Sequence, residues 1–191
     1  MSRPRPSLLP LRAGALVFLS LGGGLGLTLC DRVHLSHGVL TQVDRSLFDQ
    51  AWWVFPSFVL VSAGALLGFR ALRVRRGWRP RGFYAGRALL GIAWFHAVYA
   101  LTGPLGRLDG WLAFALVLLW GLRLLVRPDR LALQFSLALA VVGPLLEAAN
   151  VALGNFAYLT PDLGLVPSWL PAIYLHGGLM VARLEPLLEP C

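Results

Sequence analysis

Apolar residues occur along this chain in six blocks, and shorter segments that carry most of the charge separate them. Uninterrupted apolar blocks are typical of helices that cross a bilayer, whereas helices of soluble proteins alternate apolar and polar faces. The pattern therefore predicts an all-α membrane protein, a compact bundle of six transmembrane helices that forms a single domain over residues 1–191. The predicted helices cover residues 13–30, 52–69, 87–101, 111–125, 132–153 and 169–182.

Three of these predicted helices are short. The third, fourth and sixth have apolar stretches of only 14 or 15 residues, which is about 22 Å at 1.5 Å per residue. The flanking side chains of Arg87, Arg123 and Arg183 can extend towards water and make up part of the difference. The first block follows a basic N-terminus, so a signal peptide is an alternative there. No A-x-A-like site closes that block, and we expect it to be retained as a helix.

The composition excludes a soluble globule. Hydrophobic residues make up 57% of the chain and charged residues 14%, the mean hydropathy is +0.68, and a soluble domain has about 25% charged residues. The net charge of +8 comes from 17 arginines, and the chain contains no lysine. Aromatic residues do not alternate with these arginines as they do in nucleic-acid-binding surfaces, so nucleic-acid binding is excluded.

The arginines instead predict an orientation in the membrane. Fourteen of the 17 lie in the two chain ends and in the second-to-third and fourth-to-fifth connectors. The other connectors hold Arg32, Arg45 and Arg107. Because cytoplasmic connectors carry the excess of basic residues, both chain ends are predicted to lie inside.

The cysteines and histidines predict no disulfide, metal site or cofactor. Cys30 and Cys191 are expected on opposite membrane faces, roughly 30 Å apart, which is beyond disulfide reach. The chain has no metal-binding Cys or His spacing. His96 and His176 both fall near the middle of predicted helices. Two histidines could ligate haem, but alone they are a weak signal, and hydrogen bonds between helices are the favoured interpretation.

Two further clusters have ordinary interpretations. The glycines of residues 22–26 lack the Lys and Ser/Thr of a phosphate-binding loop, and they predict a close contact between helices. The arginines of residues 70–81 mark the inner side of the membrane. The alternative is that they bind anionic lipid head groups.

Two predicted helices begin with a tryptophan and proline motif. The second starts with AWWVFP at residues 51–56, and the sixth starts with WLP at residues 169–171. Tryptophan suits the membrane interface, and proline in a first helical turn costs no hydrogen bond. The connector before the second helix, residues 31–50, is long enough for a short helix or a re-entrant turn. The connector before the sixth, residues 155–168, contains a Pro161-Asp162 turn.

These motifs resemble the insulin-induced gene (Insig) proteins. The segment from Ser46-Leu47-Phe48 to Pro56 is similar to the start of that family's second helix. The segments YLTPD, VPSWLP and GG within residues 158–178 are similar to its last loop and sixth helix. Both blocks occur in the family's order, and together they cover about 45 residues. A T-P-D loop followed by S-W-L-P is the more specific of the two.

The resemblance implies a compact six-helix protein of the endoplasmic reticulum that binds oxysterol and retains sterol-sensing membrane partners. The family's aspartate at the position of Asp162 engages the escort protein of the sterol pathway, so Asp162 is the predicted partner contact. The chain departs from the family at Phe55, Ala172 and His176 and in having no lysine. Its heavy use of Arg, Ala, Gly and Leu suggests a bacterium, where such a protein would lie in the inner membrane without the eukaryotic partners.

Polar residues in the fifth predicted helix are the main candidates for a binding site, since ionisable groups at membrane depth are costly. Glu147 and Asn150 share one face, and Gly143-Pro144 predicts a kink just before them. They would present hydrogen-bonding groups to a lipid hydroxyl in a cavity between helices. The alternative is a polar clamp between helices, worth about 0.6–2 kcal/mol per hydrogen bond. The predicted ligand-binding residues are Glu147, Asn150, Trp53, Pro56, Trp169 and His176.

The main functional hypothesis is a non-catalytic regulator or scaffold that binds a membrane lipid. The ligand would be a sterol or, in a bacterium, a glycerolipid with one free hydroxyl such as diacylglycerol, entering laterally between helices. A polytopic membrane protein partner and a homo-oligomer fit this hypothesis.

Two other classes of function have less support in the sequence. An intramembrane enzyme on a prenyl or carotenoid-type lipid would use Glu147 with His96 or His176 as acid and base. The chain has only nine carboxylates, and no paired-aspartate motif that could hold Mg²⁺ and diphosphate. A small transporter would need internal repeats, and the tryptophan-proline motifs do not occupy matching positions in two halves.

Overall fold

The computed structural model describes residues 11–47, 49–78 and 82–189, and most of these residues are helical. Each of the six predicted helices overlaps one observed α-helix. The α-helices are α1 (Ala13–Ser36), α2 (Val54–Arg75), α3 (Ala85–Leu105), α4 (Asp109–Val126), α5 (Arg130–Ala152) and α6 (Leu170–Leu184). The remaining elements are the 3-10 turns η1 (Gly106–Leu108) and η2 (Glu185–Leu188) and the strands β1 (Leu40–Gln42) and β2 (Phe156–Tyr158).

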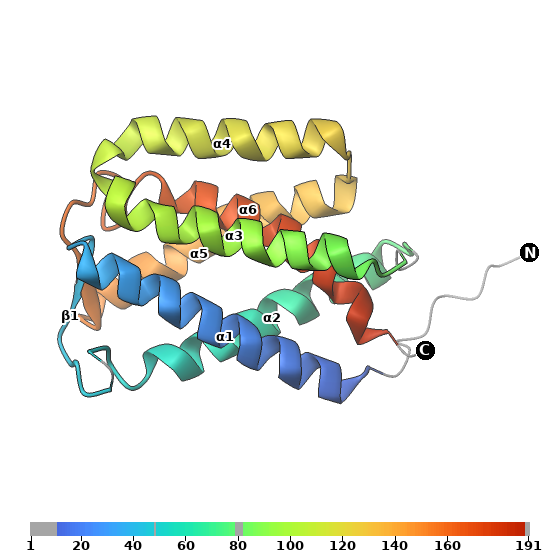
Figure 1. Ribbon diagram of the computed structural model, residues 1–191, viewed down its shortest axis with the longest axis horizontal. Helices are drawn as coiled ribbons and strands as arrows, with labels where there is room; N and C mark the ends of the chain where they lie inside the picture. Colours follow the sequence, from blue (N-terminus) through green and yellow to red (C-terminus); the bar gives the residue numbers. More distant parts are fainter. Residues whose placement is uncertain (1–10, 48, 79–81, 190–191) are drawn as a thin grey trace, which may run out of the picture.

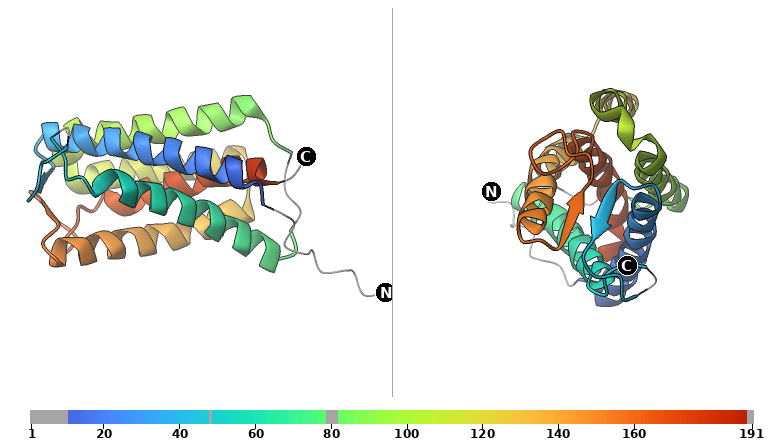
Figure 2. Two further views of the ribbon diagram at one scale, coloured as in Figure 1. Left: turned by 90° about the horizontal axis from the view of Figure 1, so that it is seen from below. Right: turned by 90° about the vertical axis from the view of Figure 1, so that its left-hand side faces the viewer.

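Successive helices run in opposite directions along one bundle axis (Figure 1). The central helix is α6, which contacts α2, α3, α4 and α5 and has a largely buried sequence. Seen along the axis, the other helices surround it, and α4 lies outermost (Figure 2). In this arrangement the short α6 is packed on several sides, and α4 packs mainly against α6.

The outward faces of the helices are apolar. Phe18 of α1, Leu60 of α2, Leu89 of α3, Phe114 of α4 and Leu145 of α5 are all more than 60% exposed. Exposed apolar surface on this scale marks contact with lipid or another protein. Together with helix length, it supports an integral membrane protein.

Four segments are long and apolar enough to cross a membrane. The third of these segments contains α3 and α4, which fold back on each other at η1 (Figure 1). The helix α6, with 15 residues, falls short of that length. Six spans and an inward orientation of both ends stay predictions. The four segments are Ala13–Ser36, Val54–Arg75, Ala85–Val126 and Arg130–Ala152.

The prediction of a mainly α-helical protein is confirmed, with a small strand pair added at the end of the bundle opposite the chain ends (Figure 1). The described part of residues 31–50 contains no separate short helix: α1 continues to Ser36, and β1 then pairs antiparallel with β2. Leu40 lies opposite Tyr158, and Gln42 lies opposite Phe156. Strand pairing satisfies backbone groups of two connectors that are distant in sequence, and three-residue strands leave no periodic pattern by which to predict them.

The predicted glycine contact is confirmed. A Cβ at Gly23 would lie 2.6 Å from Oγ of Ser62, and one at Gly24 would lie 2.5 Å from Cγ2 of Val59, both on α2. A Cβ at Gly26 would overlap the imidazole of His96 on α3. The glycines of α1 therefore let two neighbouring helices approach closely.

The two ends of the described chain lie at one end of the bundle (Figure 1). The backbone amide of Arg12 donates to the carbonyl of Leu188 at 3.1 Å. This common end also holds the α2–α3 and α4–α5 connectors, and most of the described arginines lie in these connectors or in the adjoining ends of the helices. We refer to it as the arginine-rich end.

The predicted arginine cluster at residues 70–81 divides into buried and exposed members. The guanidinium of Arg73 donates to Glu185 at 2.8 and 3.0 Å and also to Glu189, and all three side chains are largely buried. Arg70 lies 3.8 Å from Glu189. These two arginines join α2 to η2 and are not available to lipid head groups. Arg75 and Arg76 are exposed, while Arg79 and Arg81 lie outside the described residues, as do Phe48 and Cys191.

Replacing Arg73 with Met should destabilise the protein by about 3–5 kcal/mol, because Glu185 would remain buried without its main cation. Thermal unfolding of the purified protein in detergent measures the effect. The control is Arg75→Met on the same helix, whose exposed side chain should change stability by no more than about 0.5 kcal/mol. Equal, small effects of both substitutions would mean that the buried pair contributes nothing specific.

Candidate functional site

A cavity of about 520 Å³ lies between α2 and α5. These two helices touch each other far less than α2 touches α1 or α5 touches α6. Val61, Gly64 and Ala65 of α2 and Leu139 and Leu146 of α5 form apolar walls. A volume within about 300–1,000 Å³ and a mainly apolar lining are typical of small-molecule sites.

The end of this cavity near β1 and β2 is polar. Eight of the lining side chains carry hydrogen-bonding groups, while the rest of the lining is mostly apolar. The cavity therefore combines a polar part with a larger apolar part. The polar lining residues are Asp31, Gln42, Trp53, Ser57, Tyr99, Glu147, Asn150 and Tyr174.

Glu147 is the centre of this polar end. Its Oε2 accepts a hydrogen bond from the Tyr158 hydroxyl at 2.5 Å, and its Oε1 accepts one from the Tyr174 hydroxyl at 2.8 Å. Burial, and secondly the charge of Glu147, raise the pKa of Tyr158 in β2 well above its ordinary value, so this hydroxyl stays protonated and donates. Each carboxylate oxygen retains acceptor capacity. Glu147 thus serves as a clamp between helices and still faces the cavity.

The approach of Tyr174 depends on a glycine. A Cβ at Gly143 of α5 would overlap the Tyr174 ring, so only glycine lets α6 place this tyrosine beside Glu147. Pro144 follows within α5 without ending the helix. The Gly143-Pro144 pair therefore permits a close contact one turn before the carboxylate.

A second carboxylate lies at the same end of the cavity. Asp31, in the last turns of α1, is buried and accepts hydrogen bonds from the amides of Gln42 at 2.9 Å and Gln50 at 3.0 Å. Gln42 in turn accepts from the backbone amide of Ala51. This network joins α1 and β1 to the segment just before α2. Sequence reasoning missed Asp31 because it directly follows an apolar block and was assigned to a connector.

Asn150 and Trp53, from the predicted ligand-binding set, line the cavity with Glu147. Asn150 donates to the carbonyl of Leu146 and accepts from Asn155. Trp53 is the residue that precedes the first turn of α2, where Pro56 also lies. Pro56, Trp169 and His176 are not among the lining residues.

Trp169 instead belongs to a buried aromatic cluster at the start of α6. Its ring stacks on His34 with centroids 5.6 Å apart, and the Tyr158 ring meets it edge-on at 6.4 Å. His34 also hydrogen-bonds to Thr102 at 2.7 Å. Trp169 therefore positions Tyr158, a donor to Glu147, from behind the cavity.

His176 and His96 have separate surroundings. Nε2 of His176 lies 3.0 Å from the carbonyl of Leu116, which makes Nε2 the donor, and Nδ1 then accepts from Arg123 at 3.0 Å and from Trp94 at 3.3 Å. Nδ1 of His96 lies 2.9 Å from the carbonyl of Ile92. Neither ring is bonded to Glu147.

Asp162 is exposed in the connector before α6, and both of its carboxylate oxygens are used within that connector. Oδ1 accepts from the backbone amide of Ser168 and Oδ2 from its hydroxyl, each at 2.6 Å. Gly164 has a φ of +65°, which suits glycine at the turn between them. The aspartate thus closes a loop of residues 162–168 and fixes the entry into α6.

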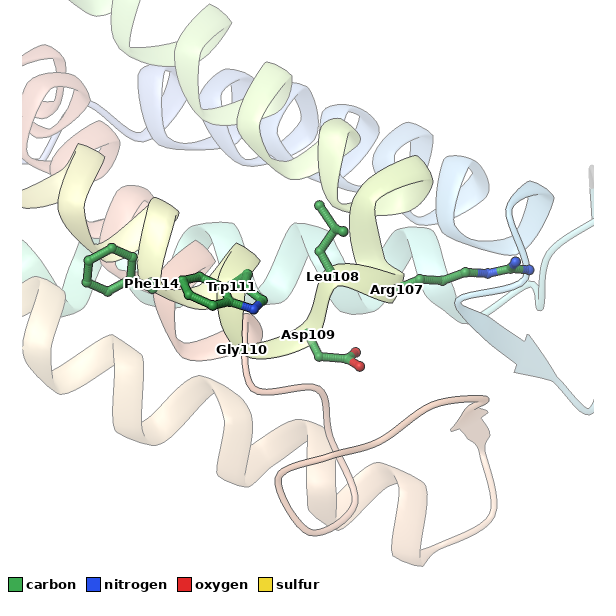
Figure 3. A pocket seen from close by; sticks show the side chains of 6 residues that line it. All are labelled: Arg107, Leu108, Asp109, Gly110, Trp111 and Phe114. Atoms are coloured by element: carbon green, nitrogen blue, oxygen red, sulfur yellow. The ribbon is translucent and has the colours of Figure 1, made fainter.

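Other hollows differ from this cavity. A smaller chamber of about 100 Å³ adjoins it towards α1 and α3, and Tyr99, Glu147 and Tyr174 line both. A wide depression of about 710 Å³ lies at the α3–α4 turn, but its lining comes only from η1 and the first turns of α4, and the side chains of Arg107, Leu108 and Asp109 point in different directions (Figure 3). Among the described residues, no group of three or more His, Cys, Asp or Glu side chains could hold a metal ion.

The fold is similar to that of solved Insig-like proteins. The crystal structure of a mycobacterial Insig homolog, MvINS from Mycobacterium vanbaalenii, is 25% identical, with a TM-score of 0.80 over 94% of this chain and 96% of that one. A cross-linked trimer of a cysteine variant of MvINS has a TM-score of 0.81 at 24% identity and the same coverage. No protein-family model matches this chain, and no curated protein matches it. The predicted resemblance is confirmed, and supports a bacterial Insig-like membrane protein.

Replacing Tyr174 with Phe should destabilise the protein by about 0.6–2 kcal/mol, since one of the two hydrogen bonds to Glu147 is lost inside the bundle. The shift of the thermal unfolding midpoint in detergent measures this cost. The exposed Tyr84 is the control, because Tyr84→Phe should leave the midpoint unchanged. A midpoint unaffected by Tyr174→Phe would argue against the clamp.

Replacing Asp162 with Ala should loosen the loop of residues 162–168 while leaving the rest of the bundle intact. The Ser168 amide would lose its acceptor, so amides 163–168 should exchange hydrogen for deuterium faster. Asp44→Ala is the matched control, because Asp44 accepts a hydrogen bond from Ser46 in the α1–α2 connector. It should affect only its own connector.

Proposed function

We propose that this chain is a non-catalytic membrane protein that binds a membrane lipid between α2 and α5 and serves as a regulator or scaffold. The observation that carries the proposal is the cavity of about 520 Å³, whose long apolar walls end at Glu147, Asn150 and Trp53. A lipid with one free hydroxyl fits this lining: its hydroxyl would donate to Glu147, and its apolar body would lie along α2 and α5. Sterol-like molecules and diacylglycerol share this chemistry.

The proposed topology is six spans with both ends inside, in the inner membrane of a bacterium. The common position of the arginine-bearing connectors and both chain ends favours this orientation, since basic residues mark the cytoplasmic side. The short α6 lies in the centre of the bundle, where it contacts neighbouring helices and not mainly lipid. It therefore does not need the full hydrophobic length of a lipid-facing helix.

Assembly and partners extend this proposal. MvINS has been crystallised as a cross-linked trimer, which favours a homo-oligomer here as well. A polytopic membrane protein partner would approach the outer connector at Asp162. Because both oxygens of Asp162 bond within the connector, its contribution would be the shape of the loop.

An intramembrane enzyme has less support. The acid and base would be Glu147 with His96 or His176, but neither histidine lines the cavity. His176 is turned towards Arg123, and His96 packs against Gly26. The groups that meet Glu147 are tyrosine hydroxyls.

Filling the cavity should exclude the lipid. Gly64 lines it, and a Cβ there would meet open space, so Gly64→Leu projects a side chain into the cavity without a clash. Lipid mass spectrometry on protein purified in mild detergent should find one lipid class enriched in the parent protein and reduced several-fold in this variant.

The matched control is Gly121→Leu on α4, where a Cβ also meets nothing within 4 Å and the cavity is distant. It should retain the enriched lipid. Glu147→Gln tests the polar end: we expect weaker lipid retention by a protein that still folds. Lipids that match the bulk membrane in all samples would refute a specific lipid site and leave a protein scaffold.

A further inference from the structure

Four arginines line a second, smaller cavity at the arginine-rich end of the bundle. This pocket of about 200 Å³ is formed by α3, α4, α5 and α6, and the apolar side chains of Leu179 and Ala182 contribute to its lining. It shares no lining residue with the cavity between α2 and α5. The arginines are Arg87, Arg123, Arg127 and Arg183.

The positive charge of this pocket is not neutralised by carboxylates. Within the ranges that the structure describes, none of the four arginines forms an ion pair. The carboxylate that lines the pocket belongs to Asp129. Its Oδ1 accepts hydrogen bonds from the amides of Leu131 and Ala132, both at 3.1 Å, and caps α5. One carboxylate against four guanidinium groups leaves a large excess of positive charge.

Neutral groups hold the arginines in place. Nη1 of Arg123 donates to Nδ1 of the fully buried His176 at 3.0 Å, and its guanidinium lies 5.1 Å from the centre of the Trp94 ring. The guanidinium of Arg87 lies 4.5 Å from the centre of the Tyr84 ring. These contacts orient the guanidinium groups but do not offset their charge.

Close packing also fixes the stem of Arg183. A Cβ added at Gly91 of α3 would lie 3.1 Å from Cδ of Arg183, so the glycine permits the arginine to lie against that helix. Arg123 and Arg183 are half-buried, whereas Arg87 and Arg127 are exposed. The pocket therefore has a positioned inner wall and an open mouth.

Four positive charges around one pocket repel each other, and water screens them poorly where they are partly buried. An anion bound among the four guanidinium groups attracts each of them and so offsets their mutual repulsion. Guanidinium groups match the oxygens of a phosphate with paired hydrogen bonds, and 200 Å³ accommodates such a group with several waters of about 30 Å³ each. Basic pockets between membrane helices commonly receive phospholipid head groups.

We propose that the pocket formed by Arg87, Arg123, Arg127 and Arg183 binds a phosphate group, presented by an anionic phospholipid or free in solution. The site is separate from the proposed lipid cavity, so either proposal can fail while the other holds.

The test uses the full chain purified in an uncharged detergent, with inorganic phosphate or phosphatidylglycerol as the probe. The readout is the thermal unfolding midpoint, compared with chloride at equal ionic strength or with phosphatidylcholine. The pocket variant is Arg127→Gln with Arg183→Gln. The matched control is Arg75→Gln with Arg76→Gln, which removes the same charge from exposed arginines at the same end but outside the pocket.

We expect the probe to raise the midpoint of the parent protein and of the control. In the pocket variant, the probe concentration that gives half of the maximal rise in midpoint should increase at least about tenfold. This factor corresponds to the loss of one charge-assisted hydrogen bond. Without probe, the pocket variant should be as stable as the parent protein, because the repulsion between the arginines is reduced. If the double variant misfolds, Arg127→Gln alone replaces it in the test, since Arg127 is exposed.

The two probes distinguish the sources. A pocket-dependent response to phosphatidylglycerol alone identifies a lipid head group, a response to inorganic phosphate alone identifies a soluble ligand, and a response to both identifies a general phosphate site. No stabilisation of the parent by either probe would overturn the proposal. Equal responses of pocket and control variants would overturn it as well, because the effect would then be general charge screening.

Discussion

The need to pair one carboxylate inside an apolar bundle organises the half of this protein that holds β1 and β2. Glu147 is satisfied by hydroxyls from Tyr158 and Tyr174, which lie on β2 and α6. An unpaired acid in this setting would cost several kcal/mol, so these contacts constrain several elements at once. Pairing of β2 with β1 brings the α1–α2 connector to the same place, and Gly143 admits the Tyr174 ring. These contacts hold α5 against α6, and the cavity lies where α5 faces α2.

The arginine-rich end of the bundle contains two different arrangements of charge. In the first, Arg73 is matched by Glu185 and Glu189, which join α2 to the last described turn of the chain. On the other side of α6, four arginines converge with neutral supports. The first arrangement closes the fold because its charges are balanced within the protein. The second carries an excess that a ligand can balance, and a fold-stabilising role alone does not explain why His176 and Trp94 orient Arg123 where a carboxylate would be the simpler partner.

Much of the fold could be predicted from the sequence. Local hydropathy is enough to locate the helices, because they coincide with apolar blocks that arginine-bearing connectors separate. Glu147 was found for the same reason: a carboxylate stands out in an apolar block. Asp31 and Tyr174 could not be predicted as site residues. An aspartate at the end of an apolar block is indistinguishable from a connector residue, and a tyrosine inside a helix is indistinguishable from an apolar core residue. The β1–β2 pairing and the Arg123–His176 contact join residues far apart in sequence, and no local pattern encodes which of many possible partners meet.

The chemistry of each site also restricts what it can accept. Both oxygens of Glu147 already receive one hydrogen bond, so a ligand at this end of the cavity must donate to the remaining lone pairs, which a deprotonated phosphate or carboxylate head cannot do. A lipid that enters between α2 and α5 should therefore carry an uncharged hydroxyl. The arginine pocket imposes the opposite requirement, because four guanidinium groups around one carboxylate leave an excess of positive charge that favours an anion. The two proposals together predict that neutral hydroxyl-bearing lipids and phosphate-bearing ligands would be received at opposite ends of the same bundle.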